Sequence, residues 1–195
     1  MNRYVVIGLI FTWIAAGSRG AAQVESEASR QELRETLQAA FPGPQQKELA
    51  KRVGQYTTVT KFWPKPNTEP LQDSGSSIIT ELLGGRFLLE ESVNSMTAQP
   101  VSGTRMFGYN NTTQQYEASW VYAGSTAIVS LHGTSTDKGA TVNYSGTLDD
   151  PNTRKDPFSV SIHQIDGDHF VVTMRIGSPD EPERSAFETS YTRKK

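Results

Sequence analysis

From Gly54 to the end of the chain, apolar and polar residues alternate with a period of two in short segments separated by turn residues. This alternation is typical of half-buried β-strands, and short strands at regular intervals are typical of a barrel or sandwich. The predicted strands cover residues 55–63, 76–83, 87–93, 101–109, 115–122, 127–134, 141–148, 158–165, 169–176 and 186–192. No long helical pattern interrupts them, which disfavours a parallel α/β sheet. We therefore expect an all-β fold of about ten strands, an antiparallel up-and-down β-barrel or a sandwich.

The first 22 residues are typical of a secretory signal peptide. Arg3 supplies a positive start, residues 4–16 are almost entirely apolar, and small residues follow. Gly20 and Ala22 suit the −3 and −1 positions of a cut before Gln23. The apolar run is short for a membrane span, which needs about 20 residues. We predict an exported protein, periplasmic or secreted, without a stable span after cleavage; the alternative is an uncleaved N-terminal anchor.

Two helical segments are expected between the leader and the strands. Over residues 24–40, Leu33, Leu37 and Phe41 recur at helical spacing before a Pro-Gly-Pro stop, and residues 45–53 form a second short piece. The predicted organisation is a signal peptide at 1–22, an amphipathic helix and linker at 23–44, and a β-barrel domain at 45–195. The helices could cover one barrel end or act as a mobile tether.

Composition excludes several classes of protein. The chain has no cysteine, so it has no disulfide, no thiolate metal site and no lipoprotein anchor. Its formal net charge is −2, and cleavage before Gln23 removes two arginines and leaves 17 − 21 = −4. No dense run of Lys and Arg is present, which disfavours nucleic-acid binding. No protein partner can be identified from the sequence.

Several segments resemble a bacterial family known only as a domain of unknown function, numbered fifteen seventy-nine. The segments are residues 48–56 (ELAKRVGQY), 82–88 (LLGGRFL), 108–111 (GYNN), 116–120 (YEASW), 149–151 (DDP) and 190–193 (SYTR). Tyr56 stands where the family usually has Trp, and Asn110 where Asp is usual. The resemblance implies a calycin-like barrel, the architecture that lipocalins share, and it implies no activity.

No motif for hydrolase, nucleotide or zinc chemistry occurs, and neither a metal nor a cofactor is predicted. The three histidines lack paired spacing, and a lone His132 or His163 leaves haem binding only as a remote alternative. Glu90 and Glu91 are adjacent, but neighbouring side chains on a strand point to opposite faces, so the two cannot form a catalytic dyad.

The candidate site is a strand face. Alternation places Arg86, Leu88 and Glu90 on one side of a strand, and Tyr116 and Trp120 together on another. If these faces point inward, a charged Arg86–Glu90 pair lies among aromatics, an arrangement that often marks a ligand pocket. The predicted ligand-binding residues are Arg86, Glu90, Tyr109, Tyr116 and Trp120. Alternatively, Tyr116 and Trp120 simply fill the core, Arg86 reaches the rim, and nothing binds.

These patterns favour a binding protein that holds a small apolar or amphipathic molecule in the barrel. One alternative is a structural or interaction protein of the cell envelope without a ligand. Another is an exported enzyme of unknown reaction that uses Arg86 and Glu90 with Tyr109 or a histidine. The sequence does not identify the ligand.

Overall fold

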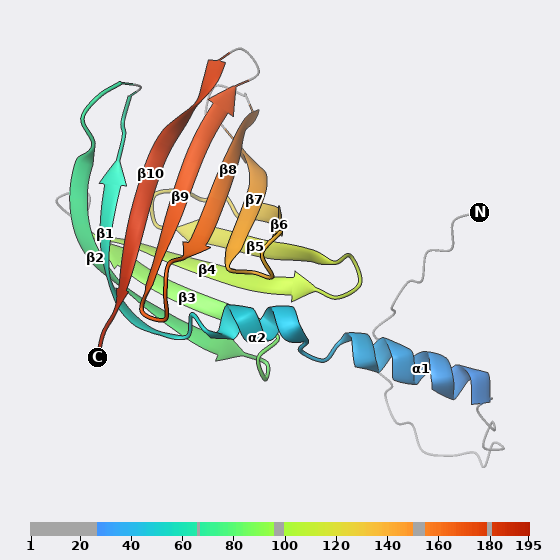
Figure 1. Cartoon of the computed structure of the whole chain (residues 1–195). Helices are drawn as coiled ribbons and strands as arrows, with labels where there is room; N and C mark the ends of the chain where they lie inside the picture. Colours follow the sequence, from blue (N-terminus) through green and yellow to red (C-terminus); the bar gives the residue numbers. More distant parts are fainter. Residues whose placement is uncertain (1–26, 66, 96–99, 150–154, 179–180) are drawn as a thin grey trace, which may run out of the picture. The chain divides into compact units, whose positions relative to one another are not determined.

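The fold is a closed β-barrel, and the predicted architecture is confirmed (Figure 1). The computed structural model describes residues 27–65, 67–95, 100–149, 155–178 and 181–195. In these residues the antiparallel strands are β1 (Gly54–Phe62), β2 (Leu71–Leu82), β3 (Phe87–Asn94), β4 (Val101–Asn110), β5 (Gln115–Tyr122), β6 (Val129–Thr134), β7 (Thr141–Asp149), β8 (Lys155–Gln164), β9 (His169–Ser178) and β10 (Glu181–Arg193). Each strand pairs with the next, and β1 pairs with β10 to close the ring.

Some strands begin earlier than predicted. β2 starts at Leu71 rather than at residue 76, and its first residues pair with the second half of β1 as far as Phe62. The segment was missed because residues 72–76 are polar and carry no apolar alternation. The structure places this segment beside the far half of β1, where the barrel interior is itself partly polar.

Both predicted helices form. α1 (Glu27–Ala39) has no buried residue, and its apolar Leu33 and Leu37 are exposed. The compact unit that contains the barrel begins at Leu37. The predicted signal peptide lies outside the described residues and stays a prediction. Among the helices of the described residues, none is long and apolar enough to cross a membrane.

α2 (Pro44–Ala50) covers one end of the barrel (Figure 1). Pro44 begins the helix, and the Gln46 side chain accepts a hydrogen bond from the Gly43 N–H at 2.7 Å. Gln46 also donates to the carbonyl of Tyr109 at 2.9 Å. Leu49 is only 2% exposed and belongs to the barrel core. The helix therefore seals the end at which β1 starts.

A buried arginine completes this seal. Arg52 is 5% exposed, and its guanidinium donates to Gln164 Oε1 at 3.2 Å and to the Gly139 carbonyl at 3.0 Å. Tyr56 donates its hydroxyl hydrogen to the Arg52 carbonyl at 2.9 Å. Burial lowers the pKa of Arg52 from its usual value. The α2 end of the barrel is thus filled by side chains.

The interior has two unlike sides. Strands β5 to β9 turn mainly apolar side chains inward, among them Leu131, Val142, Val160, Ile162 and Val172. Strands β10 and β1 to β3 also bury apolar residues such as Ile79 and Leu88, but among them they bury polar side chains, which are Thr58, Thr60, Ser77, Glu90, Ser92 and Thr189. The barrel interior is therefore mainly apolar on one side and mixed apolar and polar on the other.

The tight packing around Tyr144 gives a stability test. A Cβ at Gly133 would lie 2.7 Å from Tyr144 Cδ1 and 3.0 Å from the Asn143 carbonyl, whereas a Cβ at Gly167 would meet nothing within 4 Å. Gly133→Ala should therefore lower the free energy of unfolding by about 1–3 kcal/mol through overpacking. Urea unfolding measures the change. Gly167→Ala is the control, and an equal effect of both substitutions would contradict the packing described here.

Candidate functional site

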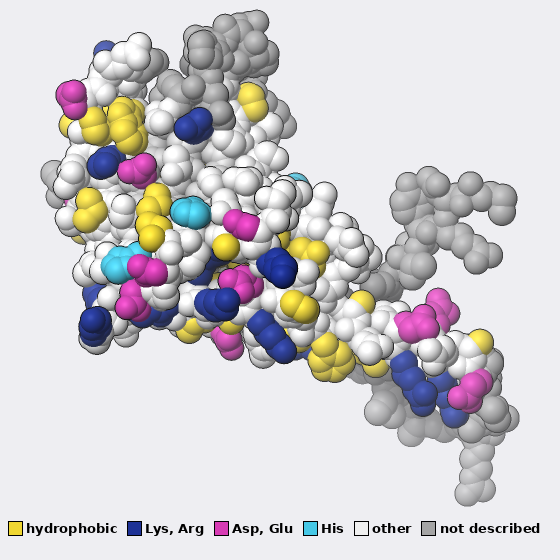
Figure 2. Space-filling model, viewed as in Figure 1, with side chains coloured by type: hydrophobic (Ala, Val, Ile, Leu, Met, Phe, Trp, Pro, Cys, Tyr) yellow, Lys and Arg dark blue, Asp and Glu magenta, His cyan; other side chains and the backbone are white. Residues whose placement is uncertain are grey.

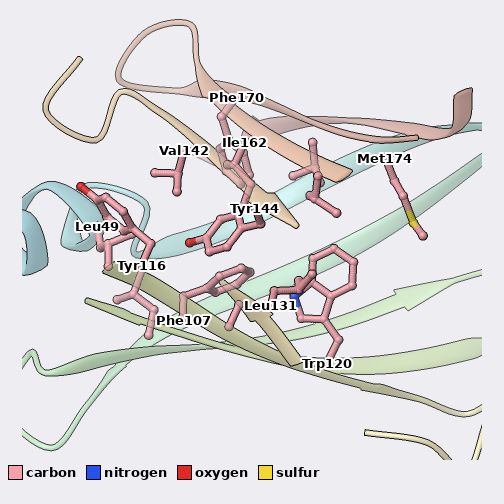
Figure 3. Close-up of a cluster of buried hydrophobic side chains, with 14 of the residues drawn as sticks. Leu49, Phe107, Tyr116, Trp120, Leu131, Val142, Tyr144, Ile162, Phe170 and Met174 are labelled. Carbon is pink, nitrogen blue, oxygen red and sulfur yellow. The ribbon is translucent and has the colours of Figure 1, made fainter. Parts of the chain in front are cut away.

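The barrel holds a cavity of about 450 Å³ in the half away from α2. Phe62, at the end of β1 far from α2, lines it, as do Leu148 and Ile176. In Figure 3, Tyr144, Phe107 and Leu131 lie between Trp120 and the α2-end residues Leu49 and Tyr116. These core side chains close the cavity on its inner side.

Two walls of different chemistry enclose this cavity. The apolar wall comes from β6 to β9 and consists of Val129, Leu148, Phe158, Met174 and Ile176. The opposite wall comes from β10, β1, β3 and β4. It carries Thr60, Ser92, Arg105 and Thr189 among apolar residues such as Phe62 and Phe187, and is called the polar wall below. The two threonine hydroxyls lie 2.9 Å apart and share a hydrogen bond. A guest molecule would therefore meet hydrocarbon on one side, and a mixed surface that carries hydrogen-bonding groups on the other.

Behind the polar wall lies a buried charged cluster. Glu90 is 2% exposed and accepts hydrogen bonds from Ser77 Oγ at 2.8 Å and from the Tyr191 hydroxyl at 2.9 Å. Nη1 of Arg105 lies 3.3 Å from Glu90 Oε2 and 3.4 Å from Oε1. The same nitrogen donates to the Tyr191 oxygen at 2.8 Å. Each charge is thus compensated inside the barrel.

The guanidinium of Arg105 is held by a ring as well as by the carboxylate. Its central carbon lies 5.0 Å from the centroid of the Trp120 ring, a cation–π contact. Burial opposes the charge of Arg105, but the Glu90 carboxylate and the Tyr191 oxygen outweigh it, so the pKa of Arg105 is raised. Arg105 therefore keeps its positive charge next to the cavity.

Tyr191 is neutral within the same cluster. Burial raises the pKa of its hydroxyl; Arg105 opposes the rise and Glu90 adds to it. Its ring stacks on Phe170 with centroids 4.1 Å apart. The protonated hydroxyl can thus donate to Glu90, as the 2.9 Å distance indicates.

The predicted site residues separate in the structure. Glu90 points inward, an orientation that the sequence left open, and the expected pairing with Arg86 is wrong because Arg105 is its partner. Arg86 instead donates to the carbonyls of Ala40 and Leu83, both at 2.8 Å. Arg86 precedes the first residue of β3, so strand alternation does not govern where its side chain points.

Two of the predicted aromatics lie at the α2 end. The rings of Tyr109 and Tyr116 are 4.9 Å apart, and neither lines the large cavity. Tyr109 and Arg86 line a second hollow of about 280 Å³ beside Gln46 of α2. Of the five predicted residues, Trp120 alone lines the large cavity, and Glu90 lies behind its wall.

Arg105 was missed by the sequence prediction. The signal that identifies it is the register of β4, where Arg105 faces Glu90 on one side and Trp120 on the other. Directly paired residues of neighbouring strands point to the same face, so an inward Glu90 implies an inward Arg105.

The histidines do not face the interior. His132 and His163 are exposed, because their buried neighbours Leu131 and Ile162 take the inward positions. Imidazole side chains are visible on the outer surface in Figure 2. Neither His132 nor His163 can therefore ligate a haem held inside the barrel. Within the described residues, no group of three or more potential metal ligands gathers.

Residues 41–193 match the sequence profile of the family described as "Protein of unknown function (DUF1579)". The chain belongs to this family. The match covers both the barrel and α2, which agrees with the compact unit that begins at Leu37. Among curated proteins, none matches the chain significantly.

A solved structure supports the fold of this DUF1579 protein. The chain is similar to Rv2717c from M. tuberculosis, with a TM-score of 0.59 and 14% sequence identity. The similarity covers 80% of this chain and 100% of the other. At this level of identity, the comparison shows a shared fold and carries no statement about activity.

The adjacent residues Glu90 and Glu91 provide a matched test of the buried cluster. Glu90→Ala leaves the cation of Arg105 without its carboxylate and should destabilise the fold by about 3–5 kcal/mol. Glu91 is exposed, so Glu91→Ala should change stability by no more than about 0.5 kcal/mol. Urea unfolding of both variants measures the difference. Similar, small effects would show that the cluster does not matter to stability.

Proposed function

We propose that this DUF1579 protein is an exported carrier that binds one small amphipathic molecule inside its barrel. The observation that carries this proposal is the cavity of about 450 Å³ between the polar and apolar walls. Sites for small molecules typically enclose about 300–1,000 Å³ and are mainly apolar with a few polar groups. The cavity matches both properties.

The two walls favour an amphipathic guest over a purely apolar one. Burial of the apolar part of a ligand against Phe158, Met174 and Ile176 would contribute about 25 cal/mol per Å² removed from water. The hydroxyls of Thr60 and Thr189 already bond to each other, but a purely apolar guest would cover the guanidinium of Arg105 without offering it a further hydrogen bond, which is costly. A polar head group removes that penalty.

The position of Glu90 argues against the enzyme alternative. Among the described residues that line the cavity, Arg105 is present and Glu90 is not. All the hydrogen bonds described above for this carboxylate run to Ser77, Arg105 and Tyr191. A bound molecule would therefore meet the guanidinium, and an acid–base role for Glu90 has no contact to support it.

Export forms the second part of the proposal and rests on residues 1–22. The apolar run, the small residues before Gln23 and the absence of cysteine all suit a soluble product released after cleavage. A carrier for a poorly soluble molecule has a clear use in an aqueous compartment outside the cytoplasm.

Fluorescence of Trp120 offers a direct test of binding. After removal of residues 1–22 the chain has two tryptophans, Trp63 and Trp120, so Trp63→Phe leaves Trp120 as the reporter. The neutral amphipathic dye N-phenyl-1-naphthylamine should quench Trp120 with saturation at a single site, because Trp120 lines the cavity. Absence of any saturable change would contradict the proposal.

A cavity-filling substitution locates the dye. A Cβ at Gly103 would have no contact shorter than 3.4 Å, so Gly103→Leu adds a side chain to the cavity without a backbone clash. The affinity for the dye should fall at least about tenfold, a loss of roughly 1.4 kcal/mol. Thr104→Leu, one residue along β4 and facing outward, is the control and should leave affinity unchanged. Equal affinities in both variants would place the dye elsewhere.

The export prediction is tested by intact mass. Expression of the full chain in a bacterial host should yield periplasmic protein that begins at Gln23. Ile10→Arg, which interrupts the apolar run, should retain the protein in the cytoplasm. Recovery of the full-length chain in the membrane fraction would instead support an N-terminal anchor.

A further inference from the structure

We infer that the ligand carries an uncharged, hydrogen-bonding head group rather than a carboxylate. This inference rests on the proposed function, since it specifies the chemistry of the molecule that the cavity holds. It comes from the charge balance of the polar wall, where Arg105 is already paired.

A lone arginine in an apolar barrel would favour an acidic ligand. Among the described residues that line the cavity, Arg105 is the one with a formal charge. An unpaired guanidinium there would bind a carboxylate through paired N–H donors. The presence of Arg105 alone would therefore predict a fatty acid or a similar anion.

Glu90 removes that preference. Both of its oxygens lie 3.3–3.4 Å from Nη1 of Arg105, and its side chain is 3% exposed. The pair is therefore neutral as a unit. A second carboxylate would have to leave water, share a single guanidinium and approach the negative charge of Glu90, and each of these steps is unfavourable.

An uncharged head group has none of these costs. Arginine has five N–H donors, and the contacts to Glu90 and Tyr191 all come from Nη1. The other nitrogens of Arg105, on the side chain that lines the cavity, are suited to an alcohol, ester or amide oxygen. The hydroxyls of Ser92 and of the Thr60–Thr189 pair add donors and acceptors to the same wall.

The geometry also orients the ligand. Arg105 lies near the middle of β4, whereas Val101 begins that strand at the end away from α2. Phe62 and Leu148 line the cavity from the same outer end. The head group therefore lies deepest, against Arg105, and the apolar body extends along the apolar wall.

The experiment compares molecules of one chain length that differ only in the head group. 1-Decanol, methyl decanoate and sodium decanoate displace N-phenyl-1-naphthylamine from the wild-type protein at neutral pH. The two uncharged compounds should bind at least about tenfold more tightly than decanoate, a difference that corresponds to roughly 1.4 kcal/mol.

Glu90→Gln then reverses the preference. The substitution keeps an oxygen that can accept from Ser77 and Tyr191 but removes the negative charge from the pair. Decanoate should gain at least about tenfold in affinity relative to 1-decanol, because Arg105 becomes an uncompensated cation. Glu91→Gln on the outer face is the matched control and should keep the wild-type order.

The possible outcomes separate the inference from the proposed function. Decanoate binding to the wild type as tightly as 1-decanol would overturn the inference and leave the carrier function intact. Failure of all three compounds and of the dye to bind would overturn both. Should Glu90→Gln not fold, Thr189→Val replaces it. Loss of that wall hydroxyl should weaken 1-decanol binding several-fold, and an unchanged affinity would count against the inference.

Discussion

The pairing of β1 with both β2 and β10 is the constraint on which the rest of the structure depends. Val59 lies opposite Ser74 on one side and Ser190 on the other, so the first strand joins the second and the last. Because the ring is closed, the described strands have backbone partners on both sides. Successive side chains along each strand therefore point alternately to the barrel interior and to solvent. Every assignment of an inward residue follows from that closure.

The two halves of the barrel interior differ because their inward-pointing side chains differ in size. Tyr144, Leu131 and Arg52 fill the half of the barrel next to α2. The Arg52 guanidinium is hydrogen-bonded there, so side chains rather than water occupy this end. The other half keeps a hollow because small residues such as Gly103 and Ala186 stand among its inward positions. The same strands thus build a solid core at one end and a lined cavity at the other.

Sequence reasoning recovered the fold because alternation and turn residues are local properties. The period of two along β3 also placed Glu90 on the same face as Leu88, but it left open whether that face points inward. Sequence reasoning failed for Arg86, whose turn position lies outside that periodicity, and for Arg105, whose role depends on the register between β3 and β4. Register is set by contacts between distant residues, so the partner of a buried charge could not be read from one strand alone.

Arg193, the last residue of β10, contacts residues at and just before the start of β1. Its Nη2 donates to the Lys51 carbonyl at 2.8 Å, and its guanidinium lies 4.9 Å from the Tyr56 ring centroid. During synthesis, β1 emerges first but can obtain its second neighbour only after β10 has left the ribosome. Until then the nascent chain has an unpaired edge and an incomplete core. Such a chain favours late, all-or-none folding, which would also keep it open long enough for a chaperone to engage it.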